Sequence, residues 1–165
     1  MEAIASEKHI TPEDLLAELI VSEQGSVGII LLSMDPADID TIAVLPWTCL
    51  ISDSLYNSAG NPHPRLNGAF PKFLREYVHE RRIIRMEEAI KKMTSMPAQR
   101  LGIKDRGVLR RGASADILIF DPQKFRDNAS YANPKALASG METVILNGNI
   151  VYEKGAFHKP NGQAF

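Results

Sequence analysis

Asp53 is the first residue of this chain whose position suggests a chemical role. It ends the run Trp47-Thr-Cys-Leu-Ile-Ser-Asp53, whose apolar residues predict a buried strand. In folds that alternate strands and helices, the loops after the carboxyl ends of the strands build the active site, so a carboxylate there can act as a general base. The alternative is a carboxylate that only caps the turn after the strand, and the residues alone favour it.

Two further candidates lie in the loop that follows, within the run Asn61-Pro-His-Pro-Arg65. Its two prolines favour an extended, rigid backbone. Arg65 offers paired guanidinium donors, which suit the carboxylate of a substrate. For His63 we favour a hydrogen bond that orders the loop over ligation of a metal.

The elements that position these residues follow from the apolar pattern of the first half. Thr11-Pro12 predicts a helix start, and this helix should end near Gly25. The continuous apolar run at 27–32 predicts a strand covered on both faces. A short helix from Asp35-Pro36 to about Val44, with Ile39, Ile42 and Ala43 facing inward, then leads to the strand at 47–51. These two strands should lie parallel, joined by a right-handed crossover.

The second half is predicted to change from helices to strands. Two helices are expected, and the Lys and Arg pairs at 81–82 and 91–92 should lie on their solvated faces. Asn147-Gly148 is the strongest short signal for a hairpin. The predicted helices cover 70–82 and 86–96, and residues 97–102 either close the second helix or begin a new short one. The predicted strands cover 116–120, 143–146 and 150–152, and 122–141 is a loop.

Composition limits the class of protein. The 165 residues suffice for one ordinary domain, and a net charge of −1 gives no reason to expect a nucleic-acid or anionic-membrane partner. No apolar stretch reaches the roughly 20 residues of a bilayer-spanning helix, and no secretory signal pattern opens the chain. The single cysteine, Cys49, excludes an internal disulfide and fits a cytoplasmic protein.

The predicted elements do not complete a domain. Two parallel strands cannot bury both of their faces, and the later strands have no evident sheet partner. The pattern therefore indicates part of a larger fold, whose open strand edges favour self-association or pairing with the absent portion.

Three segments in this order resemble the C-terminal end of a metal-dependent amidohydrolase of the D-aminoacylase (N-acyl-D-amino-acid deacylase) branch. They are the run from Trp47 to Arg65, the pattern formed by Gly107, Gly112, Ala115 and Asp116, and the run from Val144 to Tyr152. The resemblance implies an α/β fold in which residues 1–104 form the last βα units of a (β/α)8 barrel. Residues 27–32 and 47–53 would be its seventh and eighth strands, and residues 105–165 would belong to a small β-sandwich domain.

The resemblance also assigns roles to the site residues. Asp53 would ligate or adjoin a catalytic Zn²⁺, take a proton from the metal-bound water and deliver it to the leaving amine. Arg65, His63 and Ser54 would border the substrate; Ser54 stands where relatives usually carry glycine. Asp116 is expected to order a turn rather than to act in catalysis.

The implied reaction is hydrolysis of an N-acyl-D-amino acid to a carboxylate and a D-amino acid. The chain lacks the His-x-His pair and the bridging ligand of the family's metal site, so we expect the isolated chain to be inactive and not to retain zinc. Two alternatives stay open: a portion of a cyclic-amide hydrolase of the dihydroorotase or hydantoinase type, against which the Asn61–Arg65 run argues, and a non-catalytic interaction module.

Overall fold

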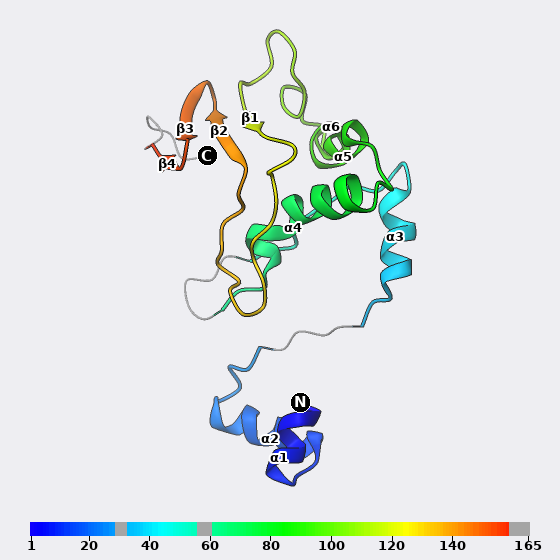
Figure 1. Ribbon diagram of the computed structural model, residues 1–165, viewed down its shortest axis with the longest axis vertical. Coiled ribbons are helices and arrows are strands. Elements are labelled where there is room, and N and C mark those ends of the chain that lie inside the picture. Colours follow the sequence, from blue (N-terminus) through cyan, green and yellow to red (C-terminus); the bar gives the residue numbers. More distant parts are fainter. Residues whose placement is uncertain (29–32, 56–60, 159–165) are drawn as a thin grey trace. The chain divides into compact units, whose positions relative to one another are not determined.

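A computed structural model describes residues 1–28, 33–55 and 61–158 (Figure 1). The chain divides into two compact units, Met1–Pro36 and Ala37–Phe165. In the described part of the chain, no helix combines the length and the apolar character needed to cross a bilayer.

The first unit is a pair of helices, α1 (Glu2–Lys8) and α2 (Pro12–Ser22). They are joined through Ala5 and Leu15, which are 2% and 1% exposed. The predicted start of α2 is confirmed, since the Thr11 hydroxyl accepts a hydrogen bond from the Asp14 amide at 3.1 Å. Val27 and Gly28 lie in no strand, and the rest of the strand predicted at 27–32 lies outside the described residues.

The predicted helix before residue 45 is confirmed as α3 (Pro36–Val44). Its two predicted inward isoleucines do not face a core, since Ile39 is 39% exposed and Ile42 is 56% exposed. Ala43 does pack against the core of the second unit, as predicted. Asp40 also anchors the helix, because its carboxylate accepts hydrogen bonds from the Tyr77 hydroxyl at 2.9 Å and from Arg81 at 2.7 Å.

The strand predicted at 47–53 is not present. Residues 45–55 have no regular secondary structure, and Trp47 and Ile51 are 61% and 69% exposed. The physical reason is that a parallel strand forms only beside a neighbour with which it shares a hydrogen-bonded ladder. In the described residues the segment meets α5 instead, where the Leu50 amide donates to the Lys92 carbonyl at 3.2 Å.

Four consecutive helical segments form most of the second unit's core. They are α4 (Arg65–Phe73), the π-helix η1 (Leu74–Glu80), α5 (Met86–Met93) and α6 (Ser95–Arg100). The first begins five residues earlier than predicted, because the Gly68 amide already closes a helical turn onto the Pro64 carbonyl at 3.0 Å. The core they enclose contains Phe73, Leu74, Tyr77, Ile84, Ala89 and, from the following loop, Phe125.

The geometry of η1 changes which residues share a face. Its backbone bonds span five residues, as where the Arg81 amide donates to the Glu76 carbonyl at 2.9 Å. Side chains five apart therefore meet, and Arg75 donates to Glu80 at 2.9 Å. The same arginine also reaches Asp127 in the loop that follows β1.

The C-terminal strands form one antiparallel sheet in the order β1-β2-β3-β4. The strands are β1 (Ile117–Phe120), β2 (Met141–Leu146), β3 (Asn149–Glu153) and β4 (Ala156–Phe157). The predicted hairpin is confirmed, with positive φ angles of 47° at Asn147 and 78° at Gly148. Asp116 orders its turn as expected, since its carboxylate accepts the Asn147 amide at 2.8 Å.

Between β1 and β2 the chain leaves the sheet and returns to α4 (Figure 1). We call residues 121–140 the α4 loop. A bridge between Arg126 and Ser139 closes it near its base. Gly140 makes this closure possible: its φ is 84°, and a Cβ at this position would overlap the backbone of Lys124 and Phe125.

We expect Gly140→Ala to destabilise the chain much more than Gly148→Ala. Both glycines have positive φ angles, which cost about 1–2 kcal/mol for alanine. Only at Gly140 does the new methyl meet backbone atoms, adding about 1–3 kcal/mol for overpacking. Urea unfolding of both variants measures the difference; equal losses would contradict the close approach at Gly140.

Candidate functional site

The structure brings two of the predicted site residues together. Arg65 Nη2 lies 3.0 Å from Asp53 Oδ2, an ion pair between the first turn of α4 and the segment before it. Both side chains are accessible, at 42% exposed for Arg65 and 73% for Asp53. A carboxylate that can accept a proton and a cation that can bind an anion thus share one accessible position.

The backbone at Asp53 is unusual. Its φ is 47°, in the left-handed region that few residues other than glycine adopt. Aspartate enters this region more readily than most residues, because its short polar side chain can form local hydrogen bonds. The turn aims the carboxylate at Arg65 instead of continuing the extended direction that the sequence predicted.

Ser54, by contrast, is turned toward its own backbone. Its hydroxyl donates to the Ser52 carbonyl at 3.3 Å, and the residue is half-buried. The hydroxyl therefore orders the turn at Asp53 in this structure.

His63 makes a loop-ordering hydrogen bond. Its Nδ1 accepts the backbone N–H of Arg65 at 3.0 Å. Because Arg65 is the first residue of α4, this amide is one of those that a helix leaves without an internal partner. Burial, followed by the charges of Arg65 and Lys72, lowers the pKa of His63 below its ordinary value.

Tyr131, in the α4 loop, is a member of this cluster that the sequence did not indicate. Its ring meets that of His63 edge to face, with centroids 5.4 Å apart and planes at 82°. Its hydroxyl lies 3.4 Å from His63 Nε2, at the long end of hydrogen-bond range. No local signal could have found the pair, since 68 residues separate its members.

The α4 loop is held against both α4 and η1. Asn67 Nδ2 donates to the Lys135 carbonyl at 3.1 Å. The guanidinium of Arg75 binds Asp127 with Nε–Oδ1 at 2.7 Å and Nη2–Oδ2 at 3.3 Å. Gly68 has no side chain, and a Cβ added to it would lie 3.5 Å from the Cβ of Asp127. The loop therefore passes close to the backbone of α4 at this position. The loop that carries Tyr131 is therefore fixed to the helix that carries Arg65.

Lys92 supports the segment that precedes Asp53 in the chain. The sequence predicted a solvated lysine, which is wrong: the residue is 1% exposed. Its ammonium donates to the carbonyl of Leu45, to the carbonyl of Thr48 at 3.1 Å and to the Thr48 hydroxyl at 3.2 Å. These acceptors belong to the residues just after α3, so Lys92 sets the path of the chain toward Asp53.

The described residues do not by themselves fit a zinc site. Among them, no group of three or more His, Cys, Asp or Glu side chains is placed to hold a metal. Protein zinc sites use three or four such ligands, whereas the described part of this region offers Asp53 and His63, and both nitrogens of His63 already face protein groups.

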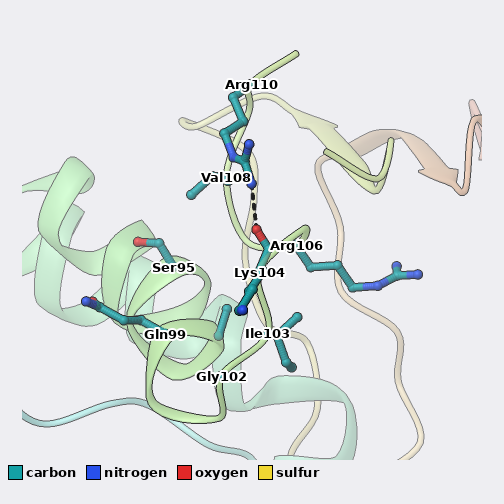
Figure 2. A pocket seen from close by; sticks show the side chains of 9 residues that line it. Ser95, Gln99, Gly102, Ile103, Lys104, Arg106, Val108 and Arg110 are labelled. Atoms are coloured by element: carbon teal, nitrogen blue, oxygen red, sulfur yellow. Dashed lines mark hydrogen bonds between the residues drawn. The ribbon is translucent and has the colours of Figure 1, made fainter. Parts of the chain in front are cut away.

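A separate pocket of about 490 Å³ lies beside α6 (Figure 2). Its polar lining includes Lys104, Arg106 and Arg110, together with Ser95 and Gln99. Arg110 Nη2 donates to the Lys104 carbonyl at 2.6 Å, and Arg106 binds Asp116. The lining contains no carboxylate, histidine or cysteine, so the pocket offers no acid–base pair like that at Asp53.

Comparison with known proteins assigns the family. Residues 36–152 match the model of the amidohydrolase family, which covers most of the described second unit. The chain belongs to this family. The matched region includes Asp53, His63, Arg65 and Tyr131.

Several relatives of this amidohydrolase chain are deacylases. It is 36% identical to N-acyl-D-aspartate deacylase of Alcaligenes xylosoxydans xylosoxydans, over 85% of this chain and 29% of the relative. A crystal structure of D-aminoacylase superimposes with a TM-score of 0.83 at 34% identity, over 98% of this chain and 32% of that one. The chain therefore spans about a third of the length of these relatives.

A second structure carries a ligand. N-acyl-D-glutamate deacylase from Bordetella bronchiseptica, complexed with zinc and a phosphonate that mimics the tetrahedral intermediate, gives a TM-score of 0.70 at 38% identity, over 74% of this chain and 26% of that one. Dihydroorotase of Lactobacillus acidophilus matches less extensively, at 29% identity over 53% of this chain. The mixed α/β fold with a small antiparallel sheet is that of amidohydrolases.

We expect Arg75→Gln to loosen the α4 loop. The substitution leaves the Asp127 carboxylate, which is 11% exposed, without its charged donor, so the free energy of unfolding should fall by about 2 kcal/mol. Arg111→Gln, at an exposed residue, is the matched control and should change the free energy of unfolding little. Urea unfolding measures both; indistinguishable variants would show that the ion pair does not hold the loop.

Proposed function

We propose that this chain is the C-terminal third of a zinc-dependent amidohydrolase that hydrolyses N-acyl-D-amino acids. The similarity to deacylases of this class extends over most of the chain and supports the assignment. The observation that carries the proposal is the 3.0 Å pairing of Asp53 with Arg65, which puts a proton acceptor beside an anion-binding group.

The domain organisation of the intact protein is part of the proposal. Residues 1–104 would complete a (β/α)8 barrel, and residues 105–165 would complete a small β-sandwich. Segments 27–32 and 47–53 would become barrel strands once the remaining two-thirds supplies neighbours for their ladders. The TM-score of 0.83 with a D-aminoacylase structure about three times as long supports this organisation.

In the intact enzyme, each of the two paired residues has one task. Water attacks the amide carbonyl carbon, and Asp53 accepts the proton that this water loses. The carbon–nitrogen bond then breaks as Asp53 returns the proton to the leaving amine. Arg65 binds the carboxylate of the amino-acid portion, with His63 and Ser54 at the rim of the site. Zinc would be held mainly by residues of the remaining two-thirds.

The isolated chain would be inactive and would associate with the remaining portion or with a second copy. Large apolar side chains on the segment around Asp53 support this, since Trp47, Ile51 and Leu55 are 61%, 69% and 87% exposed. A cytoplasmic location agrees with the single cysteine, Cys49.

A cyclic-amide hydrolase is the second candidate. The dihydroorotase relatives favour it only over about half of the chain. The run from Asn61 to Arg65 argues for the linear substrate. A non-catalytic module is the third candidate, and it would require the Asp53–Arg65 pair to have only a structural role.

We expect Asp53→Asn to abolish most turnover of N-acetyl-D-amino acids once the chain is joined to the remaining two-thirds of a D-aminoacylase. The carboxamide keeps the shape but cannot accept the proton, so kcat should fall by about 10²–10⁴-fold. Arg65→Ala should instead raise KM by about 10- to 100-fold, the usual effect of losing a charged hydrogen bond. Arg111→Ala serves as the control. Wild-type kcat in Asp53→Asn would show that another residue moves the proton.

We also expect the purified 165-residue chain to bind no stoichiometric zinc. Even together, Asp53 and His63 provide too few ligands to hold the ion against dialysis. Elemental analysis after dialysis measures this, with the joined enzyme as the positive control. One tightly held zinc per isolated chain would mean that it carries a complete metal site of its own.

A further inference from the structure

His63 contacts two parts of the molecule at once. Its Nδ1 accepts the amide of Arg65 at 3.0 Å, and its Nε2 faces the Tyr131 hydroxyl at 3.4 Å. The first contact fixes the opening turn of α4. The second comes from the α4 loop, which is itself held to η1 by the ion pair of Arg75 with Asp127.

These contacts define the protonation state of the ring. A nitrogen that accepts a hydrogen bond carries no proton, so Nδ1 is bare. Neutral His63 therefore carries its proton on Nε2, where it points toward the Tyr131 oxygen. Protonation would place a hydrogen on Nδ1, facing the Arg65 N–H, and two donors cannot share a hydrogen bond.

The charged groups around His63 favour the neutral ring. Arg65 and Lys72 are the cations that face it from α4, and Tyr131 faces it from the α4 loop. Burial is the largest cause that lowers its pKa below 6.5, and the two cations add to it. The stabilisation from the neutral contact is therefore present above pH 6.5 and is lost as the pH falls through the lowered value.

We propose that Tyr131 and His63 are positioning residues for Arg65: they fix the backbone from which its guanidinium projects, and protonation of His63 releases it. Tyr131 orients the ring so that Nδ1 meets the Arg65 amide. His63 caps the first turn of α4 and holds the arginine beside Asp53. The consequence for substrate binding rests on the proposed function, in which Arg65 binds the substrate carboxylate.

Hydrogen exchange of the Arg65 amide tests the contact without any need for activity. In the chain as it stands, protection relative to the intrinsic exchange rate should fall about 3- to 10-fold in His63→Ala, the value expected for one net hydrogen bond. His63→Asn should retain it, since an asparagine oxygen can accept the amide two residues on. Tyr131→Phe should lower protection by a smaller factor, and the control Tyr152→Phe should leave it unchanged.

The pH dependence separates positioning from a general structural role. In the wild-type chain, protection of the Arg65 amide should fall below the pKa of His63, whereas in His63→Asn it should not. In the joined enzyme, the KM of the wild type should rise over the same pH range, whereas the KM of His63→Asn should not. Dividing the KM of the wild type by the KM of His63→Asn at each pH cancels the titration of the groups that the two enzymes share.

The outcomes of these measurements distinguish the positioning proposal from the proposed function. An Arg65 amide equally protected in the wild type and in His63→Ala overturns the proposal, as does loss of protection at low pH in His63→Asn. If protection of the Arg65 amide depends on His63 and on pH but KM does not change, the positioning contact stands. Arg65 would then not be the residue that binds the substrate carboxylate. A joined enzyme inactive toward N-acyl-D-amino acids would overturn the proposed function, while amide exchange would still test the contact.

Discussion

The bonds from the buried ammonium of Lys92 to the chain after α3 are the interaction on which the candidate site depends. In the described residues, the segment leading to Asp53 has no neighbouring strand to set its path. Lys92 replaces that ladder with donors to Leu45 and Thr48, while its own carbonyl accepts the Leu50 amide. A buried ammonium is costly to desolvate, and several backbone acceptors in place of water offset that cost.

Asp53 and Arg65 are thus held by two different supports. The segment of Asp53 is fixed from α5, whereas Arg65 is fixed from the α4 loop through His63 and through the contacts of that loop with α4 and η1. The ion pair joins these supports at accessible side chains. Rigid backbone with exposed functional groups is the arrangement expected where a site must receive a ligand.

Local signals in the sequence predicted local structure well. The Thr11 cap, the helix after Asp35 and the Asn147-Gly148 hairpin depend on residues a few positions apart, and all three are present. The strand at 47–53 was wrong because a strand depends on partners that an apolar run cannot supply. The roles of Lys92 and Tyr131 escaped prediction because their contacts cross 44 and 68 residues. The pairing of Asp53 with Arg65 likewise required the turn at residue 53.

The π-helix η1 limits how this region can change in length. Arg75 meets Glu80, five residues on, because each turn of η1 holds an extra residue, and the same segment places Tyr77 in the core. Deleting one residue would restore an ordinary α-helix and rotate everything beyond it by about 100°. Either the ion pair at its start or the buried tyrosine at its middle would then be lost. Insertions and deletions in related chains should therefore fall on either side of 74–80, with this short stretch conserved in length even where its residues differ.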